Sequence, residues 1–148
     1  VTPMTDTEAA LLWSIGEQPD DDTPRLVYAD WLDERGGASR AARAELIRAQ
    51  VRAARLPAGD PERAALEGRA MALVYSWDVR WQRDMPPGFT RLAYYRRGFP
   101  FRAQAVASLM GTEDDPRLSV VEYLELTPDV PPARLAGVLR HPVFARAK

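Results

Sequence analysis

One segment of the sequence, residues 20–36, contains the start signal, the apolar spacing and the stop signal of a complete helix. Thr23 is suited to cap the N-terminus, and Pro24 fits the first helical position because a proline has no amide hydrogen to leave unpaired. Three aspartates precede them, at the end where the helix dipole favours negative charge. Gly36 accommodates the positive φ that ends many helices. The segment therefore predicts a helix from about Pro24 to Arg35.

The apolar residues of this helix recur at helical spacing, which predicts the side that faces the core. That stripe consists of Leu26, Val27, Trp31 and Leu32. We expect Trp31 to anchor the core, and we expect Tyr28 and Asp30 to bond to the next helix, where Arg43 and Gln50 are candidate partners. On this interpretation the segment is a structural signature rather than an active site, and its members are Asp22, Arg25, Tyr28, Asp30, Trp31 and Arg35.

Three further helices are predicted in residues 1–84. Thr5 and Glu8 have the spacing of a capping box, which starts a helix that ends near Glu17. Another helix begins near Ser39. Its expected buried stripe consists of Ala42, Leu46, Ile47, Val51 and Ala54. A last one follows an aspartate-proline pair at positions 60 and 61. Four amphipathic helices joined by short loops predict a small helical bundle.

Residues 85–148 have a different pattern. Thr90 to Tyr95 alternates as a strand does, and Phe99, Phe101, Ala103 and Ala105 continue a period of two. Pro100 interrupts that run, which predicts an edge or a bulge there. Residues 120–127 form a further strand, and residues 132–140 a helix. The overall expectation is an α+β fold, with four N-terminal helices packed on a short sheet.

The sequence of residues 19–36 resembles the PDDDxPRLVYADWLDERG signature of a bacterial family, the repeat-companion domain. The family's R-A-E-x-I-R-x-Q core is matched at residues 43–50, and its W…F-R-R-G-F stretch by Trp81 and residues 95–99. The resemblance is strong over residues 7–55 and looser elsewhere. It implies a domain that often precedes leucine-rich-type repeats, and residues 121–144 are similar to one degenerate repeat of that kind. No established activity comes with the resemblance.

Composition excludes several classes of chemistry. The chain of 148 residues has no cysteine, so it has neither disulfides nor thiolate metal sites. No signal peptide and no apolar run of membrane-spanning length is visible, which favours a cytoplasmic protein without membrane contact. The net charge of −1 hides a segregation, because residues 1–34 carry a net −8 and residues 35–110 a net +8. We read this as an acidic segment balanced by arginine-rich helices, although such asymmetry also occurs in nucleic-acid-binding proteins.

Residues 75–102 interleave arginines with aromatic residues. This composition fits core aromatics with outward-reaching arginines, a protein interface, or a platform for single-stranded nucleic acid. The candidate protein-binding residues are Arg80, Arg83, Arg91, Tyr95, Arg96, Arg97, Phe99 and Arg102.

Catalytic and metal-binding motifs are not recognisable. The run Asp20–Asp22 lacks the alternating acids and central glycine of a calcium loop. The single histidine, His141, has no paired-histidine motif, and no serine lies in a nucleophile elbow. We therefore predict no cofactor, no metal and no enzymatic activity. The expected function is protein binding as an adaptor or accessory module, with an unidentified partner. The alternatives are nucleic-acid binding through residues 75–102 and, less favoured, an enzyme that uses the signature carboxylates. The sequence does not indicate an oligomeric state.

Overall fold

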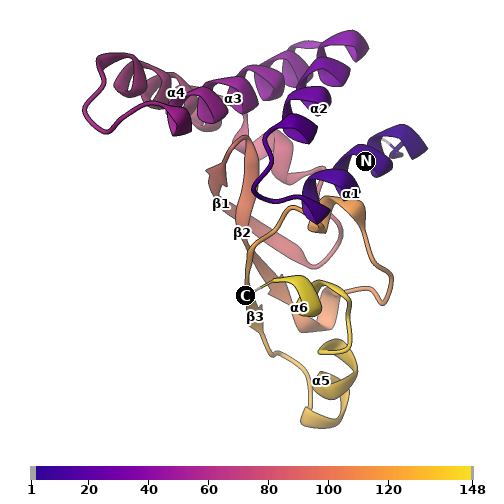
Figure 1. The fold of residues 1–148 in the computed structure, drawn as a ribbon. Helices are drawn as coiled ribbons and strands as arrows, with labels where there is room; N and C mark the ends of the chain where they lie inside the picture. Colours follow the sequence, from indigo (N-terminus) through magenta and orange to yellow (C-terminus); the bar gives the residue numbers. More distant parts are fainter. Residues whose placement is uncertain (1–2, 148) are drawn as a thin grey trace.

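The computed structural model describes residues 3–147, without the side chains of residues 90–93. It is a mixed α+β structure (Figure 1). Its helices are α1 (Asp6–Glu17), α2 (Thr23–Arg35), α3 (Ala38–Arg55), α4 (Pro61–Gln82), α5 (Pro132–Val138) and α6 (Val143–Arg146). Its strands are β1 (Phe89–Arg96), β2 (Phe99–Val106) and β3 (Tyr123–Thr127), and short 3-10 helices η1 (Ala107–Leu109) and η2 (Pro116–Leu118) lie between β2 and β3.

Local capping signals start two of the long helices as predicted. Thr5 accepts a hydrogen bond from the Glu8 amide at 3.2 Å, and Asp60 accepts one from the Glu62 amide at 2.7 Å. The start of α2 was predicted wrongly by one residue. Its cap position is Asp22, and the carboxylate of Asp21 accepts from the Thr23 amide at 2.8 Å.

The predicted buried face of α2 is also partly wrong. The buried residues are Arg25, Tyr28, Ala29 and Leu32, whereas Val27 is 48% exposed. Both stripes have helical spacing, but the tertiary packing selects the one that contains Tyr28, because that ring lies between Trp31 and Phe99. Trp31 is half-buried at the border of this cluster. The predicted stripe of α3 is wrong at Ala54, which is exposed, whereas its neighbour Ala53 is buried.

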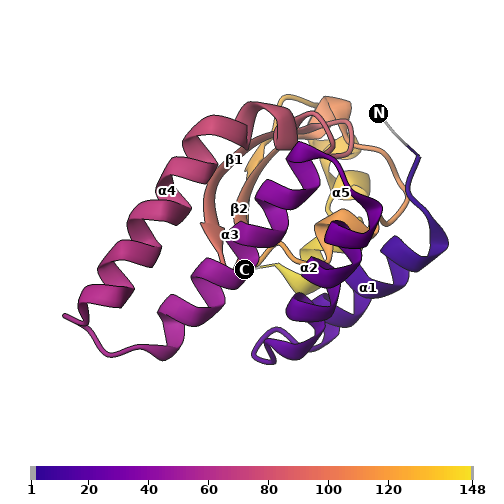
Figure 2. The ribbon, with the colours of Figure 1, turned by 90° about the horizontal axis from the view of Figure 1, so that it is seen from above.

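The four long helices lie side by side in chain order and cover the end of the sheet formed by β1 and β2 (Figure 2). α3 is buried on more than one side because α2 and α4 flank it. No helix in residues 3–147 is both long and apolar enough to cross a membrane.

The sheet has the strand order β1-β2-β3. β1 and β2 form an antiparallel hairpin, and β3 pairs with β2 in parallel after a crossover. Pro100 is paired with Tyr95, next to an irregularity in the register and outside the stretch of β2 that pairs with β3. This position costs no ladder hydrogen bond, as predicted for a proline at a bulge.

The core is shared between the two predicted segments, 1–84 and 85–148. One cluster joins Tyr28 and Ile47 of the helices to Phe99 and Val120. A second cluster places Tyr95 of β1 against α3 and α4, and a third lies between the sheet, η2 and α6. The helices and the sheet therefore stabilise each other.

Candidate functional site

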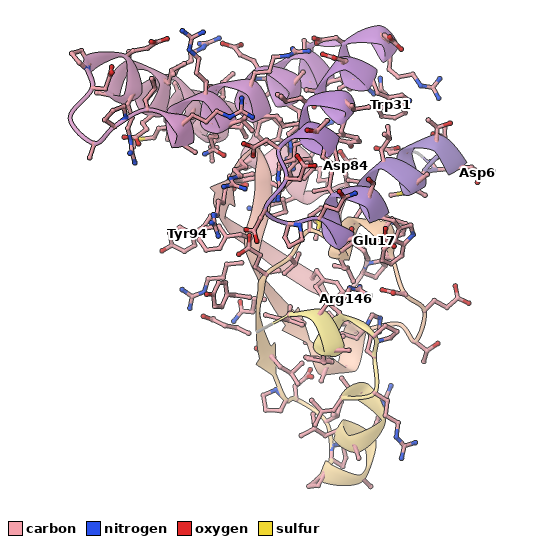
Figure 3. The ribbon with its side chains drawn as sticks, viewed as in Figure 1. Asp6, Glu17, Trp31, Asp84, Tyr94 and Arg146 are labelled. Carbon is pink, nitrogen blue, oxygen red and sulfur yellow. The ribbon has the colours of Figure 1, made fainter. Side chains whose placement is uncertain are left out.

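The exposed face of the sheet carries three aromatic rings, one from each strand. Tyr94, Phe101 and Tyr123 follow the order β1-β2-β3, with ring centroids 6.0 Å and 6.1 Å apart. Tyr94 is 54% exposed and Tyr123 is 43% exposed. Figure 3 shows Tyr94 projecting away from the strands. We call these three residues the aromatic row.

A β-bulge brings Phe101 into the row. Tyr94 is paired with Arg102 and Tyr95 with Pro100, so Phe101 is an extra residue without a partner on β1. A bulge redirects the side chain of the extra residue. The predicted period of two, which put Phe101 on the same face as Ala103 and Ala105, is therefore wrong at this position.

Two arginines of the predicted segment lie at the aromatic row, and both are paired with acids. The Arg102 guanidinium lies 5.9 Å from the centre of the Tyr94 ring and forms an ion pair with Glu125. Arg96 bonds to Glu122 at 3.0 Å. The exposed sheet face thus combines aromatic rings with charges of both signs.

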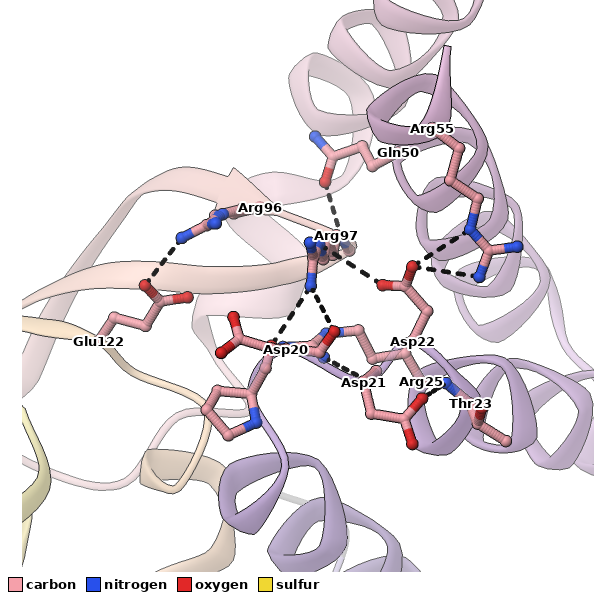
Figure 4. Close-up of polar contacts among 12 residues, drawn as sticks. Asp20, Asp21, Asp22, Thr23, Arg25, Gln50, Arg55, Arg96, Arg97 and Glu122 are labelled. Atoms are coloured by element: carbon pink, nitrogen blue, oxygen red, sulfur yellow. Dashed lines mark hydrogen bonds and ion pairs between the residues drawn. The ribbon is translucent and has the colours of Figure 1, made fainter.

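Arg97, by contrast, fastens the β1–β2 turn to the loop between α1 and α2. Its guanidinium donates to the Pro19 and Asp20 carbonyls at 3.4 Å and 3.3 Å, and lies 3.5 Å from the Asp22 carboxylate (Figure 4). Arg97 and Gly98 have φ values of 49° and 84°, which suits a two-residue hairpin turn. Arg97 therefore stabilises the fold rather than forming part of an exposed binding surface.

Tyr95 and Phe99 also lie inside the protein rather than on the predicted surface. Phe99 is a core residue, and Tyr95 packs edge-on against Trp81 and donates to Asp78 at 3.0 Å. Burial raises the pKa of the Tyr95 phenol. Both rings face Arg43, whose guanidinium lies 5.0 Å and 5.4 Å from their centres. The candidate partnership of Arg43 with Tyr28 or Asp30 is thus replaced by cation–π contacts.

The remaining predicted arginines lie at the end of α4 or in β1. Arg80 and Arg83 are exposed, and within the described part of the chain their side chains make no hydrogen bond or ion pair. The side chain of Arg91 lies outside the described residues. The predicted protein-binding residues are therefore in different places. Some lie at the aromatic row, some are buried or hold the fold together, and some lie at the exposed end of α4.

The first half of the signature, Asp22 and Arg25, makes polar contacts with neighbouring elements. The Asp22 carboxylate accepts a hydrogen bond from the Arg55 guanidinium at 3.1 Å and lies 3.5 Å from the Arg97 guanidinium. The Asp22 side chain is largely buried beside Arg25. The pKa of Arg25 is lowered because its guanidinium is buried. Its Nη1 donates to the Asp21 carbonyl at 2.8 Å.

The other half of the signature contacts α1 and α3. Tyr28 donates to Glu8 at 3.0 Å, so its partner is in α1 and not in α3 as predicted. Asp30 accepts from Arg48 of α3 at 2.6 Å. Arg35 lies over the Trp31 ring at 5.2 Å. Each of the six signature residues thus contacts another residue of this chain.

Gln50 also has a partner other than the predicted one. Its Oε1 accepts from the Gly98 amide at 2.7 Å, and its Nε2 donates to the Tyr95 carbonyl at 3.3 Å. A single side chain of α3 therefore holds both sides of the hairpin turn.

Sequence reasoning missed the glutamates of the exposed sheet face and the full extent of the aromatic row. In a strand over residues 120–127, Tyr123 and Glu125 lie on one face by alternation, but pairing with β2 is needed to bring them beside Arg102. Among the residues that the structure describes, no group of histidines and carboxylates is arranged to hold a metal ion. Comparisons of the chain with models of protein families, with curated proteins and with solved structures found no match.

Proposed function

We propose that this chain is a non-catalytic protein-interaction module, used as an adaptor or accessory subunit, and that its contact surface is the sheet face with the aromatic row. The observation that carries the proposal is the alignment of three rings across three strands, two of them substantially exposed. Tyrosines and arginines are enriched among the residues that dominate binding energy in protein interfaces.

The charges around the row favour a protein over a nucleic acid. Single-stranded nucleic acids also stack on exposed rings, and they need unpaired cations for their phosphates. Here Arg96 and Arg102 are neutralised by Glu122 and Glu125. Because the acids would repel a phosphate backbone, a partner surface with charges of both signs fits this face better.

The signature carboxylates support a structural role more than a catalytic one. General acid–base chemistry needs a carboxyl group with a suitable pKa in a cleft beside a substrate. Asp30 and Asp33 instead share the guanidinium of Arg48, at 2.6 Å and 2.7 Å, on the exposed side of the helices.

The repeat-like character of the C-terminal segment belongs to the same proposal. Arg102 of β2 pairs in parallel with Tyr123 of β3, 21 residues further along the chain (123 − 102). This offset lies within the usual range for leucine-rich repeats, about 20–29 residues. On this proposal the antiparallel strand β1 caps such an array, and β3 is the edge to which a further strand would be added.

A site-specific cross-link tests the contact surface. A photoreactive amino acid in place of Tyr94 should capture a defined protein in the host cell, identified by mass spectrometry. The same group in place of Leu109, which is equally exposed but lies in η1, beyond the end of β2 that is far from the hairpin turn, should not. With that protein purified, Tyr94→Ala should weaken binding about 30-fold, the effect of losing a typical hot-spot residue. Equal capture at both positions, or unchanged affinity, contradicts the proposal.

Nucleic-acid binding gives a different result. Fluorescence anisotropy with a single-stranded oligonucleotide would show an affinity that depends on Tyr94 and falls steeply as salt increases. Such a result would replace the protein-binding proposal.

A further inference from the structure

The outer face of α4 is uncharged along almost its whole length. Met71, Tyr75 and Val79 are 73%, 91% and 67% exposed. They recur every four residues, so they lie on one line along the helix. The exposed small residues of the same face are Ala64, Ala65, Gly68, Ala72 and Ser76. This helix therefore has an apolar stripe on each side, one facing α3 and the sheet and one facing solvent.

The exposed charges of α4 lie at the borders of this outer stripe, whereas Arg63 and Asp78 are half-buried and bond to Leu56 and Tyr95. Arg69 and Arg80 lie along one border with Glu62, and Glu67 lies along the other. Apolar residues all round a helix are typical of a helix that is covered on both sides. An apolar patch rimmed by charges is typical of an interaction site. Figure 2 shows α4 at the outside of the helical layer, where a partner has access.

We propose that the outer stripe of α4 binds a second copy of this chain, with the two α4 helices antiparallel about a two-fold axis near Met71 and Ala72. The stripe has large residues toward its C-terminal end and small ones toward its N-terminal end. An antiparallel pair therefore places Tyr75 of one copy over Gly68 of the other, and Val79 over Ala64. The surface is complementary in shape to itself, as a two-fold interface requires.

The charges at the border fit the same register. Arg80 is exposed and makes no side-chain hydrogen bond or ion pair within the described residues. In the antiparallel pair it lies opposite Glu62 of the second copy, on the same side of the interface, and the symmetry repeats the contact. The Glu62 carboxylate also forms an ion pair with Arg52 of its own chain, so Arg80 joins an existing pair. A parallel pair would instead place Tyr75 against Tyr75, leaving a gap between the small residues, and would put the two Arg80 side chains on opposite sides of the interface, each far from Glu62 of the other copy. The antiparallel arrangement is the one that satisfies both size and charge.

Disulfide trapping tests the register, and the chain offers a clean background because it contains no cysteine. Ala72→Cys places two thiols near the axis, so mild oxidation should convert the protein to a covalent dimer. Val79→Cys is the matched control on the same stripe. In the antiparallel pair its two copies are about 22 Å apart along the helix, at 1.5 Å per residue, which is too far for a disulfide. A mixture of Val79→Cys and Ala64→Cys chains should form the covalent dimer, because the antiparallel register places these two positions opposite each other.

Sedimentation velocity tests the association itself. The wild-type mass should rise from 16.5 kDa toward twice that value as concentration increases. Tyr75→Glu should keep the protein monomeric with an unchanged circular dichroism spectrum, whereas Val27→Glu, at an exposed apolar position of α2, should leave the dimer intact. Arg80→Glu should weaken the dimer at least tenfold, and Glu62→Arg added to Arg80→Glu should restore it.

Two results would overturn the proposal. One is a monomer at every concentration, and the other is equal cross-linking of Ala72→Cys and Val79→Cys, which would mean random collision or a parallel pair. Both are independent of the sheet face and of Tyr94, so the protein-binding proposal is tested separately.

Discussion

Gly98 and Ile47 are in such close contact that a methyl group at position 98 would lie 2.2 Å from Cγ1 of Ile47 and 2.6 Å from its Cα. The hairpin turn therefore rests directly on the backbone of α3. Gln50 fixes the same turn by accepting from the Gly98 amide. Because Gly98 also has a φ of 84°, this position admits only glycine.

Gly98→Ala should lower the free energy of unfolding by about 3 kcal/mol, from backbone strain at positive φ and from overpacking against Ile47. Urea denaturation measures this change. Gly68→Ala is the matched control, since it lies within α4 with no atom near the added methyl group. There the same substitution should stabilise a dilute sample by about 0.5–1 kcal/mol, the difference in helix propensity. Equal effects at the two sites would contradict this account of the turn.

Asp22→Asn should destabilise the protein because it leaves Arg25, Arg55 and Arg97 without their shared carboxylate. We expect a loss of about 2–3 kcal/mol, less than the roughly 3–5 kcal/mol for a fully buried pair, since Arg55 is exposed. The neighbouring Asp20→Asn is the control, because Asp20 is exposed and only its carbonyl is used. A change of less than about 0.5 kcal/mol for Asp22→Asn, the range of ordinary surface substitutions, would show that the cluster does not stabilise the fold.

Trp31→Ala should cost about 2–3 kcal/mol, less than the roughly 3–5 kcal/mol expected for a fully buried aromatic residue. Trp31 is only half-buried, stacked on Tyr28 at 5.6 Å and covered by Arg35. Trp31→Phe should retain much of this stability, because it preserves a ring against Tyr28. Unchanged stability in Trp31→Ala would mean that this tryptophan is available for binding instead.

Asp114 should make the stability depend on pH under acidic conditions. Two hydrogen bonds from Arg146, each 2.7 Å long, hold the pKa of this carboxyl below its ordinary value of 3.8. The folded state therefore binds the proton less readily than the unfolded state, and the contribution is complete above pH 4 and is lost as the pH falls. The difference in unfolding free energy between wild type and Asp114→Asn should be constant near neutrality and shrink in acid. A difference that grows in acid would have the wrong sign.

Prediction from the sequence succeeded where structure depends on neighbouring residues. Thr5 and Asp60 start their helices, Gly36 ends α2 with a φ of 68°, and the strands of the hairpin lie where alternation put them. Each of these features rests on hydrogen bonds or dihedral preferences within about four positions, so the local sequence contains the information.

Prediction failed where the local sequence was compatible with two different buried faces. The α2 segment has two stripes of helical spacing, and Tyr28 rather than Val27 is buried because it packs in a cluster with residues of α1, α3 and β2, among them Phe99. Alternation put Phe101 on the same face as Ala103 and Ala105, but the bulge opposite Tyr94 moves it to the aromatic row. Bulges depend on how two strands pair, which the period of either strand does not show.

The sequence by itself therefore determined the four long helices, the capping residues of α1 and α4, and the two strands of the hairpin. The tertiary structure alone decided which arginines belong to the fold and which to the surface. Arg97 was a surface candidate by composition, yet its partners lie more than 70 residues away at Pro19, Asp20 and Asp22. Arg96, next to it, reaches Glu122 on the exposed face. The physical reason is that adjacent residues of a turn point in different directions, and their partners come from segments that meet only when the chain is folded.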